Sequence, residues 1–276
     1  MPTSPTSTSA SVSPLRRASA LIAGATAALA LGLGASLVPA GPAAAAGAAD
    51  TFSRQVATGW GSAGSGGAYA SYGPAATAFS VDGSRARITR LAAGSSAGAH
   101  LPGASLLDTT ASASVALVGS TALSVYPAVE VRRQADGSSY RGKVELSRTG
   151  KVRVSTSRAD GGRETTLGGA DVAGTAAPGT AVTVRIQVTG TSPVTVSAKA
   201  WRAGTTEPGW QTTVADGSGS RIAAAGSTGV WAYASGSNSG AATLAVDDLS
   251  SAAPSTAPAT SPTPTPTSTA APTPST

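Results

Sequence analysis

The sequence predicts an all-β domain of antiparallel strands over residues 50–251. Its best-defined segments alternate apolar and polar residues with a period of two, which is the pattern of a half-buried strand. Short turns containing glycine separate these segments, and no window in this range has a convincing 3.6-residue helical period. Many short strands joined by such turns are typical of an antiparallel sandwich or barrel. About 200 residues is an ordinary size for one such domain.

Five segments carry the alternation most clearly: 128–133, 143–147, 151–157, 181–190 and 193–201. Apolar side chains occupy every second position of each segment, so they should face the interior while their neighbours face outward. The residues predicted to point inward are Val129, Val131, Val144, Leu146, Val152, Val154, Val182, Val184, Ile186, Val188, Val194, Val196, Ala198 and Ala200.

The connections between these segments have the composition of hairpin turns. Asp-Gly or Thr-Gly pairs occur within 135–138, 148–151, 159–162 and 189–193. Glycine accepts the positive φ that tight hairpin turns require, so the sequence predicts hairpins at these four places.

Residues 1–49 have the pattern of an export signal. Arg16 and Arg17 precede the apolar run 18–38, and the small residues 43–49 offer cleavage sites before Asp50. We therefore expect a secreted or cell-wall-associated protein without a stable membrane span. A retained anchor is the alternative, but the run is rich in alanine and glycine and only marginally long enough to span a bilayer. The arginine pair leaves the general and the twin-arginine export routes open.

Residues 252–276 are rich in threonine, proline and serine, and they contain no charge and no large apolar residue. Such a segment cannot bury enough surface to offset the entropy of ordering, so it is predicted to be a disordered tail.

Composition excludes several kinds of site. The chain has no cysteine and one histidine, which rules out disulfides, thiolate chemistry, cysteine-based zinc sites and histidine-rich metal sites. Residues 1–49 hold two arginines and no acidic residue, so the remainder has 17 basic and 13 acidic residues and a formal charge of +4. This excess is small and spread out, and it does not indicate a nucleic-acid partner.

The ordered pieces together resemble a known family, the concanavalin A-like (laminin G-like) jelly-roll modules of secreted actinobacterial proteins. The pieces that carry the resemblance are DTFSR at 50–54, GWGSAGSGGAY at 59–69, FSVDG at 79–83, RIQVTGTSP at 185–193, KAWRAGTTEPGWQ at 199–211, TGVWAYASGS at 228–237 and LAVDDLS at 244–250. The resemblance implies two curved antiparallel sheets, with the first and last strands pairing near Phe52 and Val246. It also implies that sugars bind on the concave sheet or at its edge.

The outward positions of the strands predict a ligand-binding face. An outward set with charges, an amide and aromatic rings suits a carbohydrate, because sugar rings stack on aromatic side chains while their hydroxyls need polar partners. The predicted ligand-binding residues are Glu130, Arg132, Arg185, Gln187, Lys199, Trp201, Trp231 and Tyr233.

The opposite orientation stays open, because small residues such as Ala198, Ala200 and Ala232 on the inward side can mean that the faces are reversed. Trp201 and Trp231 would then belong to the core. For the other two tryptophans we expect structural roles. Trp60 should be a packing anchor, and Trp210 should lie in a loop at the edge of the sandwich.

Catalysis is not expected. Retaining jelly-roll glucanases need two carboxylates on one strand face, but position i+4 from Glu130 is Gln134. His100 has only loop-like neighbours and no nucleophile elbow accompanies it. A structural calcium ion is left open, with Asp50 and Asp248 as candidate ligands, although Ca²⁺ needs six to eight oxygens. No other cofactor is expected.

The sequence therefore predicts a secreted, non-catalytic module that binds carbohydrate or cell-wall polysaccharide through an outward sheet face. A structural or adhesion protein without a small ligand is the first alternative, and a glycoside-active enzyme is the second and less favoured one.

Overall fold

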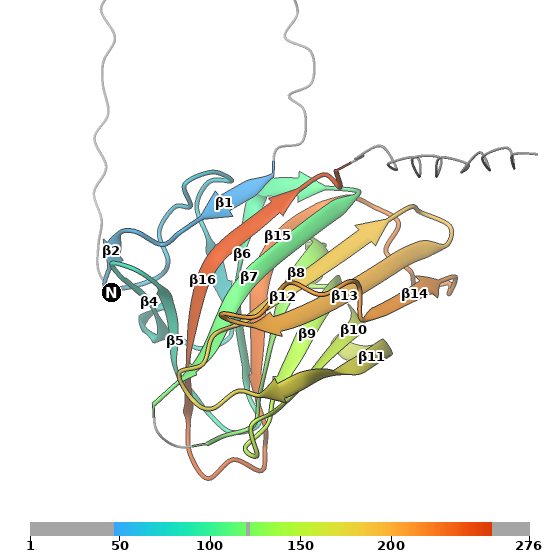
Figure 1. The fold of residues 1–276 in the computed structure, drawn as a ribbon. Coiled ribbons are helices and arrows are strands. Elements are labelled where there is room, and N and C mark those ends of the chain that lie inside the picture. The colour runs from blue at the N-terminus through green and yellow to red at the C-terminus, as the bar shows by residue number, and fades with distance from the viewer. Residues whose placement is uncertain (1–46, 120–121, 256–276) are drawn as a thin grey trace, which may run out of the picture. The chain divides into compact units, whose positions relative to one another are not determined.

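The structure, a computed structural model, describes residues 47–119 and 122–255 (Figure 1). The predicted export signal lies almost wholly outside the described residues, as does most of the predicted tail, from residue 256 on. Apart from the short 3-10 helix η1 (Ala76–Ala78), the regular elements of the described part are β-strands. No helix in this part of the chain has the length and apolar character needed to cross a membrane.

One sheet has nine antiparallel strands and lies in front in Figure 1. Its strands pair in the order β14-β13-β12-β7-β16-β5-β4-β2. In addition, β1 pairs with residues 249–251 near the C-terminal end of β16. The bounds of these strands are β1 Ala48–Asp50, β2 Gln55–Val56, β4 Phe79–Asp82, β5 Ala86–Leu91, β7 Thr109–Val118, β12 Val182–Thr189, β13 Val194–Arg202, β14 Thr212–Asp216 and β16 Ala242–Ala252.

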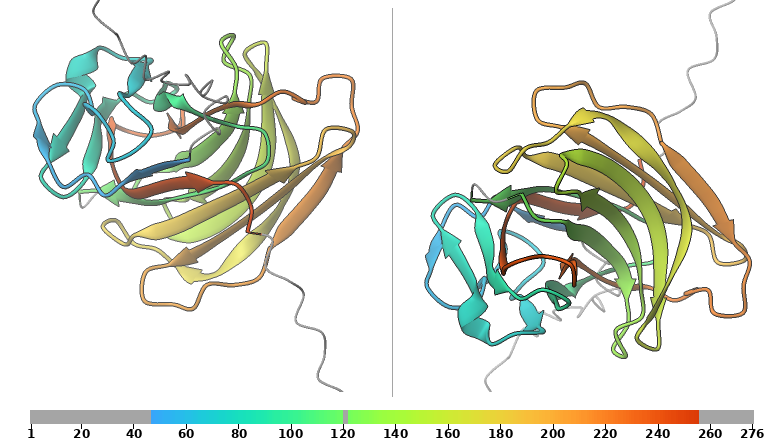
Figure 2. Two further views of the ribbon diagram at one scale, coloured as in Figure 1. Left: turned by 90° about the horizontal axis from the view of Figure 1, so that it is seen from above. Right: turned by 90° about the horizontal axis from the view of Figure 1, so that it is seen from below.

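The second sheet has seven antiparallel strands in the order β11-β10-β9-β8-β15-β6-β3. Their bounds are β3 Ala70–Tyr72, β6 Ser96–Leu106, β8 Val125–Arg133, β9 Ser139–Leu146, β10 Lys151–Asp160, β11 Arg163–Thr175 and β15 Gly226–Ala234. Figure 2 shows the two sheets packed as curved layers. The predicted antiparallel two-sheet sandwich is therefore confirmed.

Pairings between distant segments hold the sandwich together. Asp50 lies opposite Leu249 in the β1–β16 ladder, so the first and last strands pair as expected. The four predicted hairpins are also present, since β8 pairs with β9, β9 with β10, β10 with β11 and β12 with β13.

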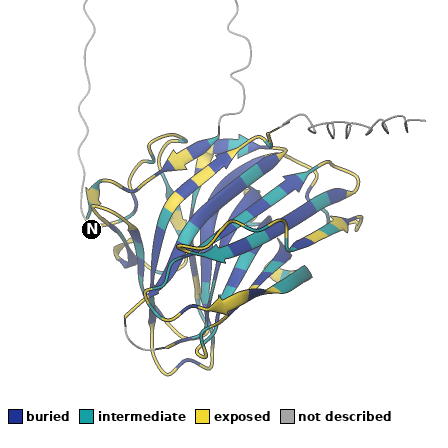
Figure 3. Cartoon of the chain, viewed as in Figure 1, coloured by how far each residue is buried: buried dark blue, intermediate teal, exposed yellow. Residues whose placement is uncertain are grey.

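The core confirms the predicted alternation. Ala198, Ala200 and Ala232 are fully buried between the sheets, so the reversed orientation is wrong for their strands. All fourteen side chains predicted to point inward are likewise buried. Figure 3 shows buried and more exposed residues alternating along the strands of the front sheet. Small inward residues are explained by close approach of the sheets, because a Cβ on Gly142 of β9 would collide with Ile186 of β12.

Trp60 is a packing anchor, as predicted. It is 1% exposed and meets Phe52, Tyr69 and Phe79 with ring centroids 5.2–5.8 Å apart, all at edge-on angles. Edge-to-face contacts of this kind are favourable for aromatic pairs, so the cluster closes the end of the core near β1.

The predicted outward position of Arg132 is wrong. The β8–β15 register shifts between Ser227 and Gly229, and Arg132 has φ 50°. A bulge of this kind turns a side chain away from the face that strict alternation gives it. The Arg132 side chain is fully buried at one end of the sandwich, where it donates to the carbonyl oxygens of Leu107, Gly190 and Ile222.

Candidate functional site

The outer face of the seven-stranded sheet carries a hollow of about 600 Å³. This volume lies in the usual range of ligand sites. Its side chains come from every strand of the sheet, which makes it a feature of the face rather than of a single loop. The lining residues are Tyr72, Ser96, Tyr126, Asp136, Gly137, Arg141, Lys143, Ala159, Gly162, Arg163, Glu164, Trp231, Tyr233 and Ser235.

Register places Trp231 in the middle of this face. Across the sheet, Trp231 of β15 lies opposite Gly98 of β6 on one side and Ala128 of β8 on the other. Tyr72 pairs with Gly98, and Lys143 pairs with Ala128. The small residues beside the indole leave room for the longer side chains of the outer strands to lean over the centre of the sheet.

Aromatic rings form one wall of the hollow. The rings of Trp231 and Tyr233 are stacked, with centroids 6.3 Å apart and an interplanar angle of 7°. Tyr126 lies beside Tyr233, with ring centroids 6.0 Å apart. Trp231 is 9% exposed, whereas Tyr126 and Tyr233 are half-buried and present more ring surface to a ligand.

A buried carboxylate organises the neighbouring polar groups. Glu130 is fully buried and accepts hydrogen bonds from Ser139 and from Arg141 Nε, both at 2.9 Å, and from the Tyr72 hydroxyl. Arg133 approaches the same carboxylate at 3.7 Å. Burial and the negative charge of Glu130 raise the pKa of Tyr72 well above its usual value. The tyrosine is therefore a neutral donor at physiological pH.

The two arginines of this network also lie on aromatic rings. The guanidinium carbon of Arg141 is 4.0 Å from the Trp231 ring centre, and that of Arg133 is 4.1 Å from the Tyr72 ring centre. Cation–π contacts at this distance are attractive, more so where water is excluded. Glu130 thus fixes two cations and, through them, two rings.

Glu164 reaches into the hollow from β11, next to the turn between β10 and β11. Its Oε2 lies 2.9 Å from Arg141 Nη1, and its Oε1 accepts a hydrogen bond from Lys143. Burial alone would raise the pKa of Glu164, but the hydrogen bond and charge of Lys143, together with Arg141, hold that pKa below its ordinary value. Glu164 is therefore ionised and forms an ion pair with each of the two cations.

The remaining predicted site residues lie on the outer face of the nine-stranded sheet. Trp201 is half-buried on β13, with the Arg185 guanidinium carbon 5.4 Å from its ring centre. Lys199 lies 4.6 Å from the ring of Trp210, which is 38% exposed in the connection to β14. Glu207 binds both Arg185 and Lys199.

Gln187 is on that second face too, where its amide donates to Thr110 Oγ1 at 3.0 Å. The structure thus divides the predicted ligand-binding set. Glu130, Trp231 and Tyr233 lie at the hollow, while Arg185, Gln187, Lys199 and Trp201 lie on the opposite sheet, and Arg132 is in the interior.

The two predicted metal ligands line a common hollow, but Asp50 is already paired with a cation. Both oxygens of Asp50 accept from Arg54, at 2.7 and 2.9 Å, and Tyr69 donates to one of them at 3.0 Å. Asp248 is exposed on β16. Within residues 47–119 and 122–255, no cluster of three or more histidine or acidic side chains is placed to hold a metal ion.

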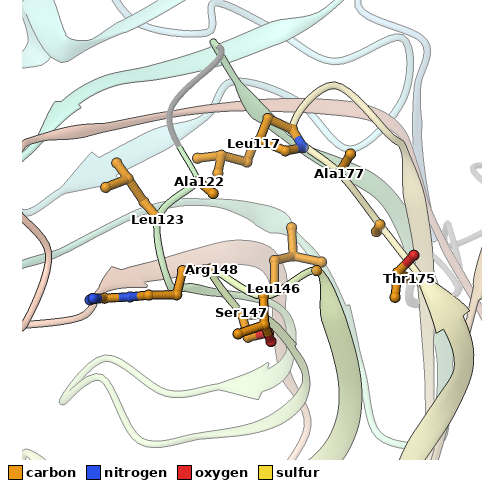
Figure 4. A pocket seen from close by; sticks show the side chains of 12 residues that line it. Leu117, Ala122, Leu123, Leu146, Ser147, Arg148, Thr175 and Ala177 are labelled. Carbon is orange, nitrogen blue, oxygen red and sulfur yellow. The ribbon is translucent and has the colours of Figure 1, made fainter.

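A second, smaller hollow of about 230 Å³ lies at one end of the sandwich (Figure 4). Leu117, Leu123, Leu146 and Pro178 give it a mainly apolar lining, with Arg148 and Thr175 among its polar side chains. It has no stacked rings and no charge pairs, so it offers fewer specific contacts to a polar ligand than the sheet face does.

The predicted ligand-binding set lacks five residues that shape the hollow: Tyr72, Tyr126, Arg141, Lys143 and Glu164. Arg141 could have been found, because extending the alternation of 143–147 back by two residues places it on the face of Lys143. Tyr72 lies on a three-residue strand in a glycine-rich region, and Glu164 follows a Gly-Gly turn. Neither has a local pattern that points to this face.

Comparison with known proteins gives likeness in fold. No protein-family model matches the sequence, and no curated protein matches it. Similar solved structures include a legume lectin-like domain from Entamoeba histolytica, with a TM-score of 0.46 and 11% identity over 68% of this chain and 90% of that one. The carbohydrate-binding module CBM66 from Bacillus subtilis has a TM-score of 0.43 and 12% identity over 66% of this chain and 94% of the module.

An enzyme is among the similar structures as well. The PL-14 alginate lyase from Aplysia kurodai has a TM-score of 0.45 and 8% identity over 73% of this chain and 99% of the lyase. At these identities the likeness concerns the β-sandwich alone. With TM-scores below 0.5, these likenesses add nothing to the two-sheet sandwich that the strand pairings establish, and the actinobacterial part of the resemblance stays a prediction.

Proposed function

We propose that this protein is a secreted, non-catalytic module that binds carbohydrate or cell-wall polysaccharide in the hollow of the seven-stranded sheet. The observation that carries the proposal is the combination of the Trp231–Tyr233 ring stack with Arg141, Lys143 and Glu164 in a single hollow. Half-buried rings offer stacking surface to the C–H faces of a sugar, and charged side chains beside them bind its hydroxyls.

The arrangement is preformed, which suits binding. Glu130 holds Arg141 in place from below, and Glu164 holds it from the side. Ordering these long side chains costs no further entropy when a ligand arrives. Tyr126 and Tyr233 supply accessible ring surface, and the buried ring of Trp231 supports Tyr233 from behind.

The same geometry weighs against glycosidase chemistry. A pair of catalytic carboxylates must reach the scissile bond from two sides. Glu130 is fully buried beneath Tyr72 and Arg141, and all its described partners are hydrogen-bond donors or cations. Glu164 is held ionised by two cations and is therefore a poor general acid.

Retention of the full-length protein on insoluble polysaccharides tests the proposal. Tyr233→Ala should weaken retention about tenfold or more, as expected for loss of an aromatic contact at the centre of a site. Trp201→Ala is the matched control, since it removes a half-buried ring from the opposite face and should leave retention unchanged. Thermal melting of both variants checks that the fold is intact.

Two outcomes would overturn the proposal. If no polysaccharide retains the wild-type protein, a structural or adhesion role without a glycan ligand is the better account. If Trp201→Ala abolishes retention and Tyr233→Ala does not, the binding face is the nine-stranded sheet instead.

A further inference from the structure

We propose that Glu164 sets the specificity of the hollow, so that it accepts neutral glycans and rejects anionic ones. This inference rests on the proposed glycan-binding function and names the class of glycan. It follows from the ion pairs that Arg141 and Lys143 of the hollow form with Glu164.

The cations at the centre of the hollow are already paired with carboxylates. Arg141 donates through Nε to Glu130 and through Nη1 to Glu164, each at 2.9 Å. Lys143 donates to the second oxygen of Glu164. The Glu164 carboxylate therefore lies where a uronate or sulfate group of a ligand would have to lie to use both cations.

The charges that line the hollow nearly balance. Arg141, Lys143 and Arg163 are positive, and Asp136 and Glu164 are negative. Behind the lining, the charges of Glu130 and Arg133 cancel. Arg163 and Asp136 are both exposed at turns, where solvent screens their charges. An anionic group entering beside Arg141 and Lys143 would have to share these two cations with Glu164, whose negative charge repels it.

A hydroxyl group meets no such obstacle. It is both donor and acceptor, so it can donate to the free lone pairs of Glu164 and accept from the remaining N–H groups of Arg141 or Lys143. Paired charges of this kind present donors and acceptors side by side. A neutral sugar, which carries neighbouring hydroxyls, satisfies both at once.

Glu164→Gln is the decisive variant because it keeps the shape and hydrogen-bonding reach of the side chain while removing its charge. It frees Arg141 and Lys143 to bind an anion. The opposite sheet offers a matched control in Glu207→Gln, since Glu207 also bridges one arginine and one lysine beside tryptophan rings. Both variants change the net charge by the same amount.

The experiment measures retention of the full-length wild type and both variants on neutral polysaccharides (cellulose, β-1,3-glucan, galactan) and anionic ones (alginate, polygalacturonate, dextran sulfate). The wild type should bind at least one neutral glycan and bind the anionic ones more weakly. Glu164→Gln should gain about tenfold in affinity for an anionic glycan, and this gain should fall as salt is added. Glu207→Gln should not show the gain.

The specificity proposal is overturned if the wild type prefers anionic glycans, or if Glu164→Gln gains no anionic binding beyond that of Glu207→Gln. Both results are compatible with glycan binding in the hollow. Failure of the underlying function has a different signature, because the wild type and Tyr233→Ala would then be equally unretained on every neutral polysaccharide.

Discussion

The guanidinium of Arg141 lies 4.0 Å from the ring centre of Trp231, and its Nε donates to the buried carboxylate of Glu130 at 2.9 Å. Arg141 thereby couples a carboxylate that is inaccessible to solvent with the most central ring of the hollow. The pair links the stability of the seven-stranded sheet to the geometry of the candidate site.

This coupling predicts a strongly non-additive double-mutant cycle. Arg141→Met leaves the fully buried Glu130 without its closest cation and should lower the free energy of unfolding by about 3 kcal/mol. Adding Glu130→Gln removes the stranded charge, so the double variant should be less destabilised than the sum of the two single variants. Urea unfolding of the four proteins measures this, and strictly additive effects would contradict the proposed coupling.

Gly98 is predicted to be essential for the position of Tyr72. A Cβ at residue 98 would overlap the Tyr72 phenol and approach the Val230 carbonyl oxygen at 2.7 Å. Gly98→Ala should therefore destabilise the protein by about 2 kcal/mol, the usual cost of overpacking, and weaken glycan retention. Gly217→Ala is the control, because nothing lies within 4 Å of its added Cβ. Equal melting temperatures for the two variants would refute this role of Gly98.

We predict that Arg132 stabilises the fold and does not contact a ligand. Its guanidinium donates to the carbonyls of Leu107, Ile222 and Gly190 at 2.6, 2.7 and 2.7 Å. Arg132→Met would remove these three hydrogen bonds, leave the buried Ile222 carbonyl unpaired and should cost about 3 kcal/mol of unfolding free energy.

Arg153→Met is the comparison for Arg132→Met. The Arg153 side chain is 49% exposed and pairs with Asp171, which is 86% exposed, so its loss should change stability by less than about 0.5 kcal/mol. Chemical denaturation of both variants decides the point. Similar effects at the two positions would mean that the buried contacts of Arg132 contribute little.

Asp216 is predicted to make the fold sensitive to acid. Burial opposes its ionisation, but hydrogen bonds from Ser218, Arg158 and Tyr140 outweigh burial and lower its pKa to about 2. Since the folded pKa lies below the unfolded value of 3.8, the stabilisation is complete above about pH 5 and is lost as the pH falls toward 2. The contribution is about 2 kcal/mol.

Asp216→Asn isolates this contribution. The variant should be less stable than the wild type at pH 7, and the gap between the two should narrow by about 1.5 kcal/mol between pH 5 and pH 2.5. Other carboxylates that titrate in this range, such as Asp82, cancel in the difference. Stability curves that stay parallel through this range would show that Asp216 is not the titrating group.

The sequence predicted best those features that depend only on residues that are neighbours along the chain. Period-two alternation placed Val184 and Ile186 in the core, because neighbouring side chains of a strand must point to opposite faces. It failed at Arg132, where a bulge changes the register. The position of a bulge depends on how a strand pairs with its partner. The sequence of β8 alone contains no pattern that predicts this bulge.

The candidate site was predicted only in part for a related reason. Alternation allows both Trp201 and Trp231 to point outward, but it does not show that their strands belong to different sheets. Sheet membership is decided by pairings between segments far apart in the chain, such as β15 with β6 and β12 with β7. The two tryptophans therefore lie on opposite faces.

By itself, then, the sequence determined the class of fold, the period-two alternation of the main strands and the hairpin turns, and it left open whether the aromatic side chains of two strands point inward or outward. Only the tertiary structure decided which of those aromatics share a face, and that Tyr72, Arg141 and Glu164 join them. The physical reason is that strand direction and turn chemistry are properties of neighbouring residues. A binding face, in contrast, depends on register across seven strands, and long-range packing sets that register.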